Sequence, residues 1–165
     1  MLVDLRGFFS GENAKKNIEY NFSLADVEVQ GVKPFISPIQ VKAEISSKAQ
    51  SVRLNAHLSY DYKMPCDRCM ADTTSHSSLV IDSLLTKEDC EDLSDEFITV
   101  GDEIDLDEFL YGEIILNLPV KYVCEDDCKG LCETCGVNLN VEQCSCNKQK
   151  IDPRLEVLKL LLEDE

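Results

Sequence analysis

The chain has 165 residues, the length of one domain with room for a small appended module, and its 44% hydrophobic content can supply a core. Its formal net charge of -16 argues against direct, sequence-independent nucleic-acid binding, which draws most of its affinity from Lys and Arg; a basic protein partner fits better. No apolar run approaches the roughly 18 residues that span a bilayer. The N-terminus has no apolar signal segment, so we expect a cytoplasmic location and no membrane partner.

The N-terminal residues 1–19 are weakly patterned, and the first expected strand follows them. Tyr20, Phe22 and Leu24 alternate with polar residues, which is typical of a strand with one buried face. Val27 and Val29 follow, and we expect the strand to continue through them. A loop punctuated by glycine and proline comes next.

Two longer runs predict a β-hairpin with one buried face. Apolar residues alternate from Ile39 to Ile45 and again from Val52 to Tyr62, with a polar link at 46–50 between them. His57 falls on the opposite face from the apolar residues of its run. We therefore expect it in solvent and not on a metal.

The second run leads into Cys66-Asp67-Arg68-Cys69, a C-x-x-C motif. Strand-like character resumes from Thr73 to Asp82, which predicts a second hairpin with this cysteine knuckle at its tip. His76 lies in the returning strand, and we expect it to be exposed or hydrogen-bonded and not a ligand.

A strongly acidic segment occupies residues 88–113, with twelve carboxylates and neither Lys nor Arg. Most acidic runs are solvated faces; the alternative is a surface that binds a basic partner. No histidine or nucleophile accompanies the carboxylates, so nothing there indicates catalysis. Cys90 lies in this segment without a companion at ligand spacing, and we leave it out of the metal count.

The remaining pattern predicts a short strand and two helices. Phe97–Val100 is β-like, and Asp105 is a suitable N-cap for a helix that Pro119 ends. Asp152-Pro153 opens a final helix with an apolar face that includes Leu155, Leu158 and Leu162.

The expected fold class is α+β. A mostly antiparallel β-sheet or barrel-like core occupies residues 1–123, and a cysteine-rich zinc-binding segment, with a helix packed on it, occupies residues 124–165.

The cysteines carry the chemistry of this chain. Nine cysteines without an export signal favour thiolates that hold metal in a reducing compartment over a disulfide framework. Four thiolates complete a structural zinc shell, so one or two Zn²⁺ ions are expected. We predict a compact site, and a second site whose formation depends on tertiary proximity. The compact site takes Cys132, Cys135, Cys144 and Cys146; the other joins Cys66 and Cys69 to Cys124 and Cys128.

Two other uses of these cysteines stay open. An iron–sulfur cluster also takes four cysteines, although paired knuckles followed by glycine are more typical of zinc. A thiol-disulfide oxidoreductase could use Cys66/Cys69, but no βαβ pattern surrounds the motif, and Arg68 is the one nearby cation that could lower a thiol pKa. Four cysteine ligands leave no open position for water, so we expect the zinc to staple the fold and the protein not to be an enzyme.

The order of these motifs resembles the bacterial YceD-type large ribosomal RNA subunit accumulation proteins. The resemblance runs from about Tyr60 to Leu162. It is carried by Cys66–Cys69, Ile104–Glu108, Glu113–Pro119, Cys128–Cys132, Cys135–Asn140, Cys144–Cys146 and Asp152–Leu155.

The resemblance implies a non-enzymatic role in accumulating large-subunit (23S) ribosomal RNA, hence in ribosome biogenesis. The charge favours a basic ribosomal protein or assembly factor as the partner of the segment 88–113, and no small-molecule substrate is expected. The alternatives are the oxidoreductase and a zinc-stabilised protein that binds pre-ribosomal RNA directly. The latter predicts salt-sensitive binding.

Overall fold

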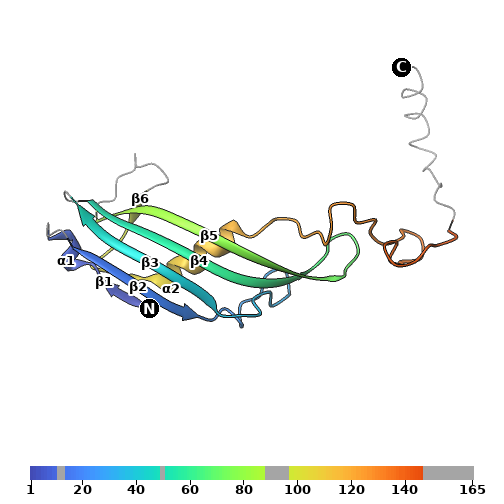
Figure 1. Cartoon of the computed structure of the whole chain (residues 1–165), viewed down its shortest axis with the longest axis horizontal. Coiled ribbons are helices and arrows are strands. Elements are labelled where there is room, and N and C mark those ends of the chain that lie inside the picture. Colours follow the sequence, from blue (N-terminus) through green and yellow to red (C-terminus); the bar gives the residue numbers. More distant parts are fainter. Residues whose placement is uncertain (11–13, 49–50, 88–96, 147–165) are drawn as a thin grey trace, which may run out of the picture. The chain divides into compact units, whose positions relative to one another are not determined.

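The computed structural model describes residues 1–10, 14–48, 51–87 and 97–146. The chain divides into two compact units (Figure 1). The first contains Met1–Met64 and Asp72–Tyr122, and the second joins Pro65–Ala71 to the chain from Val123 onwards. No helix among the described residues has the length and apolar character needed to cross a membrane.

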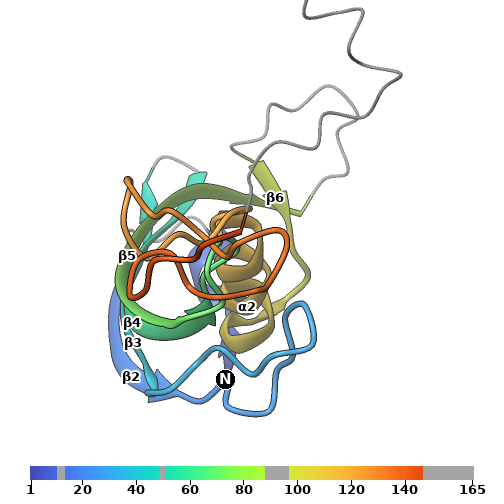
Figure 2. The same ribbon diagram turned by 90° about the vertical axis from the view of Figure 1, so that its right-hand side faces the viewer.

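The first unit is built on a five-stranded sheet in the order β2-β3-β4-β5-β6. Its strands are β2 (Lys15–Phe22), β3 (Ile39–Lys48), β4 (Ser51–Pro65), β5 (Asp72–Thr86) and β6 (Phe97–Thr99). β2, β3 and β4 pair antiparallel, whereas β6 pairs parallel to β5. Figure 2 shows the sheet curving around a helix, but within the described part of the chain its edges, β2 and β6, are not paired with each other. The sheet is therefore open, and the barrel-like alternative is wrong.

The predicted hairpin of β3 and β4 is confirmed with its buried face. Val41 pairs with Leu58 and Ile45 with Leu54, and all four side chains are buried. His57 on the opposite face is exposed, as the period of two requires. β5 returns from the cysteine knuckle, so the second predicted hairpin is also present.

A helix fills the concave side of the sheet. α2 (Leu106–Asn117) buries Leu106, Leu110 and Ile114 completely, at the spacing of one helical face. The Asp105 carboxylate caps it by accepting a hydrogen bond of 3.0 Å from the Asp107 N–H. Leu118, extended at φ -65° and ψ 141°, ends it because the residue before a proline disfavours the helical conformation.

At the N-terminus the structure differs from the expectation drawn from the sequence. β2 ends at Phe22 and does not continue through Val27 and Val29. Val29 instead pairs with Val32 across Gln30 and Gly31, whose positive φ values of 53° and 78° are those of a tight reversal. The short elements β1 (Leu2–Asp4) and α1 (Arg6–Phe9), and the pairing of β1 with β7 (Glu103–Asp105), were missed. Three or four residues are too few to show a period.

Three predictions fall outside the described residues. They are the final helix from Asp152 to Leu162, the position of Cys90, and the part of the acidic segment at 88–96.

Candidate metal centres

The structure brings eight cysteines together in two sets of four. Within each set the sulfur atoms all lie within 4.8 Å of one another. The first set is Cys66, Cys69, Cys124 and Cys128, and the second set is Cys132, Cys135, Cys144 and Cys146. These are the two groups expected from the sequence: spacing alone predicted the second set, whereas the first depended on tertiary proximity that the sequence does not show. Both belong to the second unit.

Sulfur separations in the first set fit a tetrahedral ion. Zn–S bonds of about 2.3 Å place the sulfurs of a tetrahedron roughly 3.8 Å apart. The Sγ atoms of Cys66 and Cys128 are 3.9 Å apart, and those of Cys69 and Cys124 are 3.6 Å apart. This set can therefore hold a zinc-sized ion without a change of backbone.

The C-x-x-C knuckle of the first set is closed by backbone hydrogen bonds. The Met70 N–H donates to the Cys66 carbonyl oxygen at 2.9 Å, and the Cys66 N–H donates to the Ala71 carbonyl oxygen at 2.8 Å. The Arg68 N–H points at the Cys66 sulfur, 3.4 Å away. The chain can reverse this tightly because Met70 adopts a left-handed conformation with φ 59°.

The knuckle of the second set has the same hydrogen-bond pattern. The Gly136 N–H donates to the Cys132 carbonyl oxygen at 2.8 Å, and the Cys132 N–H donates to the Val137 carbonyl oxygen at 2.8 Å. Gly136 has φ 73°, a conformation open to glycine at little cost. In the sequence, Gly136 directly follows the C-x-x-C motif of Cys132 and Cys135.

Contacts at Arg68 and Gly130 join the segment of Cys66 and Cys69 to the segment of Cys124 and Cys128. The Arg68 guanidinium donates from Nη1 to the carbonyl oxygens of Asp126 and Cys128, at 3.0 and 3.1 Å. Its own carbonyl oxygen accepts from the Leu131 N–H at 3.0 Å. A Cβ at Gly130, where φ is 74°, would lie only 3.0 Å from that same oxygen. Arg68 is thus a scaffold residue of the site.

Asn140 contacts the first set and was not expected there from the sequence. Its amide nitrogen lies 3.2 Å from the Cys128 sulfur and donates to it. Asparagine is common in loops, and only the tertiary fold brings this one to a cysteine twelve residues away.

Hydrogen bonds divide the thiols of each set into acidic and basic members. Burial raises the pKa of Cys66, but N–H groups of Cys124, Cys69 and Arg68 outweigh it and lower this pKa to about 6. The adjacent Cys128 sulfur raises the pKa of Cys124 to about 12. In the second set, N–H groups of Cys135 and Thr134 lower the pKa of Cys132 to about 6. Each set therefore presents a thiolate at neutral pH to which a cation can bind first.

Comparison with known proteins places the chain in a family. The model of the family described as "Large ribosomal RNA subunit accumulation protein YceD" matches residues 54–162, about two thirds of the chain. The chain belongs to the YceD family. All eight cysteines of the two sets lie inside the matched range.

Relatives of this YceD-family chain are found in bacteria and plants. The uncharacterized protein YlbN of Bacillus subtilis (strain 168) is 27% identical over 133 residues, which cover 79% of this chain and 77% of YlbN. The chloroplastic large ribosomal RNA subunit accumulation protein YCED homolog 1 of Arabidopsis thaliana is 24% identical over 147 residues, covering 70% of this chain and 46% of that protein. An uncharacterized Mycobacterium tuberculosis (H37Rv) protein is 36% identical over 107 residues, covering 61% and 50%. No solved structure matches the chain.

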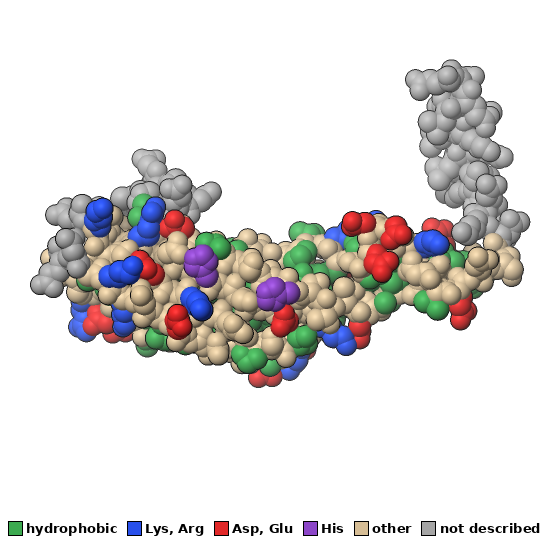
Figure 3. Space-filling model, in the orientation of Figure 1, with side chains coloured by type: hydrophobic (Ala, Val, Ile, Leu, Met, Phe, Trp, Pro, Cys, Tyr) green, Lys and Arg blue, Asp and Glu red, His purple; other side chains and the backbone are tan. Residues whose placement is uncertain are grey.

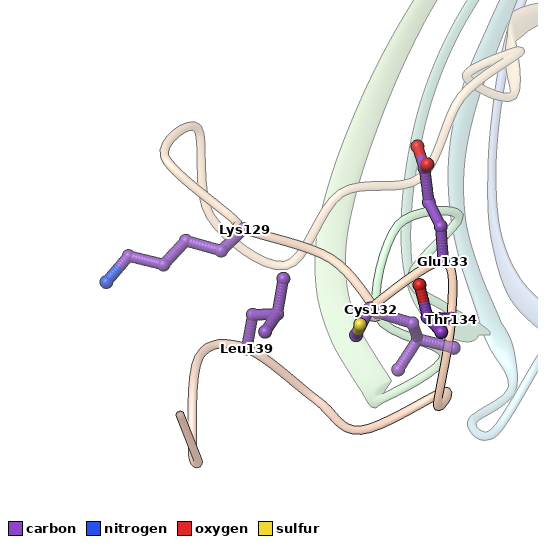
Figure 4. A pocket seen from close by; sticks show the side chains of 6 residues that line it. Lys129, Cys132, Glu133, Thr134 and Leu139 are labelled. Atoms are coloured by element: carbon purple, nitrogen blue, oxygen red, sulfur yellow. The ribbon is translucent and has the colours of Figure 1, made fainter. Parts of the chain in front are cut away.

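The two sets differ in their access to solvent. Cys66 and Cys69 are 0% and 4% exposed, and only Cys124 of the first set is more than slightly accessible. In the second set Cys135 is exposed and only Cys132 is buried. A cavity of about 270 Å³ lies beside the second set, lined by Lys129, Leu131, Cys132, Glu133, Thr134 and Leu139 (Figure 4). A solute reaches the second set more easily than the first.

Neither histidine is a member of the two cysteine sets. Figure 3 shows both on the surface of the first unit, where His76 Nδ1 lies 2.7 Å from an Asp61 oxygen and its Nε2 lies 3.3 Å from the Ser59 hydroxyl. The His76 contact also lowers the pKa of Asp61. The expectation of an exposed, hydrogen-bonded His76 is met.

Several carboxylates of the acidic segment have partners within the chain. Asp102 pairs with Lys87, and Asp105 and Asp107 pair with the α-amino group of Met1 at 2.8 and 2.7 Å. The Tyr20 hydroxyl also donates to Asp107 at 2.7 Å. Glu103 and Glu108 are exposed. In the described residues, part of this segment therefore stabilises the β1–β7–α2 corner.

Proposed function

We propose that this protein is a non-enzymatic factor that promotes accumulation of large-subunit ribosomal RNA during ribosome biogenesis. The observation that carries the proposal is membership of the YceD family across residues 54–162. Relatives from Arabidopsis thaliana and Zea mays bear the name large ribosomal RNA subunit accumulation protein.

Two structural Zn²⁺ ions belong to the proposal. Thiolate sulfur is a preferred ligand of zinc, and four cysteines complete its shell without leaving a position for water or substrate. Burial of Cys66 and Cys69 supports the same role, because a redox partner needs access to a sulfur atom. The ion in the first set would join Pro65–Ala71 to the segment that carries Cys124 and Cys128, and the ion in the second set would close the knuckle at 132–146.

The partner that fits the charge is a basic ribosomal protein or assembly factor. The chain carries a net charge of -16, and an RNA phosphate backbone would be repelled by it. Among the described residues of the acidic segment, Glu103 and Glu108 are exposed and suited to contact such a partner.

Deletion of the gene in its native host tests the function. The ratio of large- to small-subunit ribosomal RNA should fall and should be restored by the wild-type gene. An unchanged ratio would contradict the proposal. A Cys66→Ser/Cys69→Ser gene should restore the ratio poorly, with protein abundance measured in parallel.

A pull-down from lysate tests the partner. The Glu103→Gln/Glu108→Gln variant should recover less ribosomal protein than wild type, and the matched control Glu125→Gln/Glu142→Gln, which changes the net charge equally in the second unit, should recover as much as wild type. Equal recovery by all three would exclude the acidic segment. Recovery abolished by ribonuclease would indicate that RNA is the direct partner.

A further inference from the structure

The two cysteine sets are joined by a very short connection. Cys128 belongs to the first set and Cys132 to the second, with Lys129, Gly130 and Leu131 between them. This connection is paired with the loop at 136–143, which lies between two cysteines of the second set. Leu131 forms a β-bridge with Asn138, and the Leu139 N–H donates to the Gly130 carbonyl oxygen at 2.9 Å. The second set therefore positions a loop that lies against the first.

Asn140 projects from this loop to the first set. Its Oδ1 accepts from the Lys129 N–H at 2.8 Å, and its Nδ2 donates to Asn138 Oδ1 at 3.0 Å and to Cys128 Sγ at 3.2 Å. Because a backbone N–H can only donate, it fixes the oxygen side of the amide toward Lys129. The NH₂ group must then face the sulfur, so its orientation follows from the network.

A hydrogen-bond donor at this position stabilises the charged form of a metal-bound thiolate. Hydrogen bonds to a charged group are stronger than those between neutral groups, and the sulfur keeps its charge only in the deprotonated, metal-ligating form. Residues that hydrogen-bond a metal ligand typically change metal affinity by about 10- to 100-fold.

We propose that Asn140 is a positioning residue that couples the two sets, so that metal in the second set raises the metal affinity of the first. The inference rests on the proposed metal sites. A metal ion in the second set holds Cys135 and Cys144 together, closes the loop between them and presents Asn140 to Cys128. The coupling is reciprocal, because a contact that favours one bound state favours the other equally.

Cadmium NMR on the full chain tests the coupling, since each four-cysteine site gives its own signal and chelator competition gives the affinity of each. Asn140→Leu removes the donor at similar volume and should lower the affinity of the first set by about 10- to 100-fold. Asn140→Asp keeps the acceptor for the Lys129 N–H but places a carboxylate oxygen by the sulfur. The first set should therefore lose more cadmium affinity in this variant than in Asn140→Leu. Gln143→Ala, an exposed amide on the same loop, should leave the affinity unchanged.

A variant with the second set disabled, Cys144→Ser/Cys146→Ser, decides whether the effect is coupling. Its first set should bind cadmium more weakly than wild type, and adding Asn140→Leu should weaken it by no more than roughly twofold further, the usual scatter of additivity. An equal effect of Asn140→Leu with and without the second set would overturn the coupling, as would no effect in either. Absence of both cadmium signals in wild type would overturn the metal sites themselves.

Discussion

Met70 occupies in the first knuckle the same left-handed position that Gly136 occupies in the second. Each follows the second cysteine of its C-x-x-C motif, and each donates its N–H to the carbonyl oxygen of the first cysteine. The same knuckle therefore occurs twice in the fold. Gly136 suits its left-handed conformation, whereas Met70 carries a side chain that disfavours it.

This equivalence predicts an asymmetry between substitutions. Gly136→Ala places a Cβ in a left-handed conformation and should destabilise the metal-loaded protein by about 1–2 kcal/mol. Met70→Gly relieves that strain but loses roughly 0.5–1 kcal/mol to the greater freedom of the unfolded glycine, so it should be near neutral. Denaturant unfolding measures both. Equal losses in the two variants would show that the knuckles are not equivalent.

Gly130→Ala should destabilise the first set for two reasons. In addition to the left-handed strain, the new Cβ would lie 3.0 Å from the Arg68 carbonyl oxygen, which accepts from Leu131. We expect lower thermal stability and faster loss of one metal ion to chelator. Gly112→Ala is the control: it adds a methyl group in α2 with no atom within 4 Å and should stabilise by up to about 1 kcal/mol. Stability of Gly130→Ala equal to wild type would contradict the close approach.

Elemental analysis should find two metal ions per intact chain. Cys66→Ser/Cys69→Ser and Cys144→Ser/Cys146→Ser should each retain one ion, because each removes two ligands from one set. One ion in both the intact chain and the Cys66/Cys69 variant would leave the first set without metal.

In the metal-free, reduced protein, the stability contributed by the four thiols with the largest pKa shifts should be greatest near pH 9. The pKa values of Cys66 and Cys132 are lowered from 9.0 to about 6, so their contribution is complete above pH 9 and is lost as the pH falls to 6. The pKa values of Cys124 and Cys146 are raised from 9.0 to about 12, so their contribution is complete below pH 9 and is lost as the pH rises. Melting temperatures between pH 6 and 11 check this.

Melting temperatures of the Cys66→Ser/Cys132→Ser variant over the same pH range supply the control. The rise between pH 6 and 9 should shrink, because the two thiols with lowered pKa values are gone. A rise of unchanged size would assign it to other groups.

The sequence predicted what local periodicity encodes. Alternation over Ile39–Ile45 and Val52–Tyr62 predicted the central hairpin, and cysteine spacing predicted the second set. The first set was proposed by pairing the remaining cysteines, because spacing does not show which distant pairs meet. Arg68 and Asn140 were not identified as scaffold residues because their partners lie far along the chain or are backbone carbonyl groups, which leave no pattern in side-chain types. The end of β2 was missed because the apolar pair Val27 and Val29 resembles further strand, whereas Val29 pairs locally with Val32 across a turn.

The two sets also differ in how far apart their cysteines lie in the sequence. All ligands of the second set lie within residues 132–146, whereas Cys66 and Cys128 of the first set are separated by 62 positions. Closing a longer loop costs more chain entropy, and a contact of long range forms late in folding. With metal bound as proposed, the local set would take up its ion as soon as its own segment exists, whereas the long-range set would bind only after β5, α2 and the intervening chain have formed. Loss of the long-range ion alone would reopen that loop and leave the local knuckle intact.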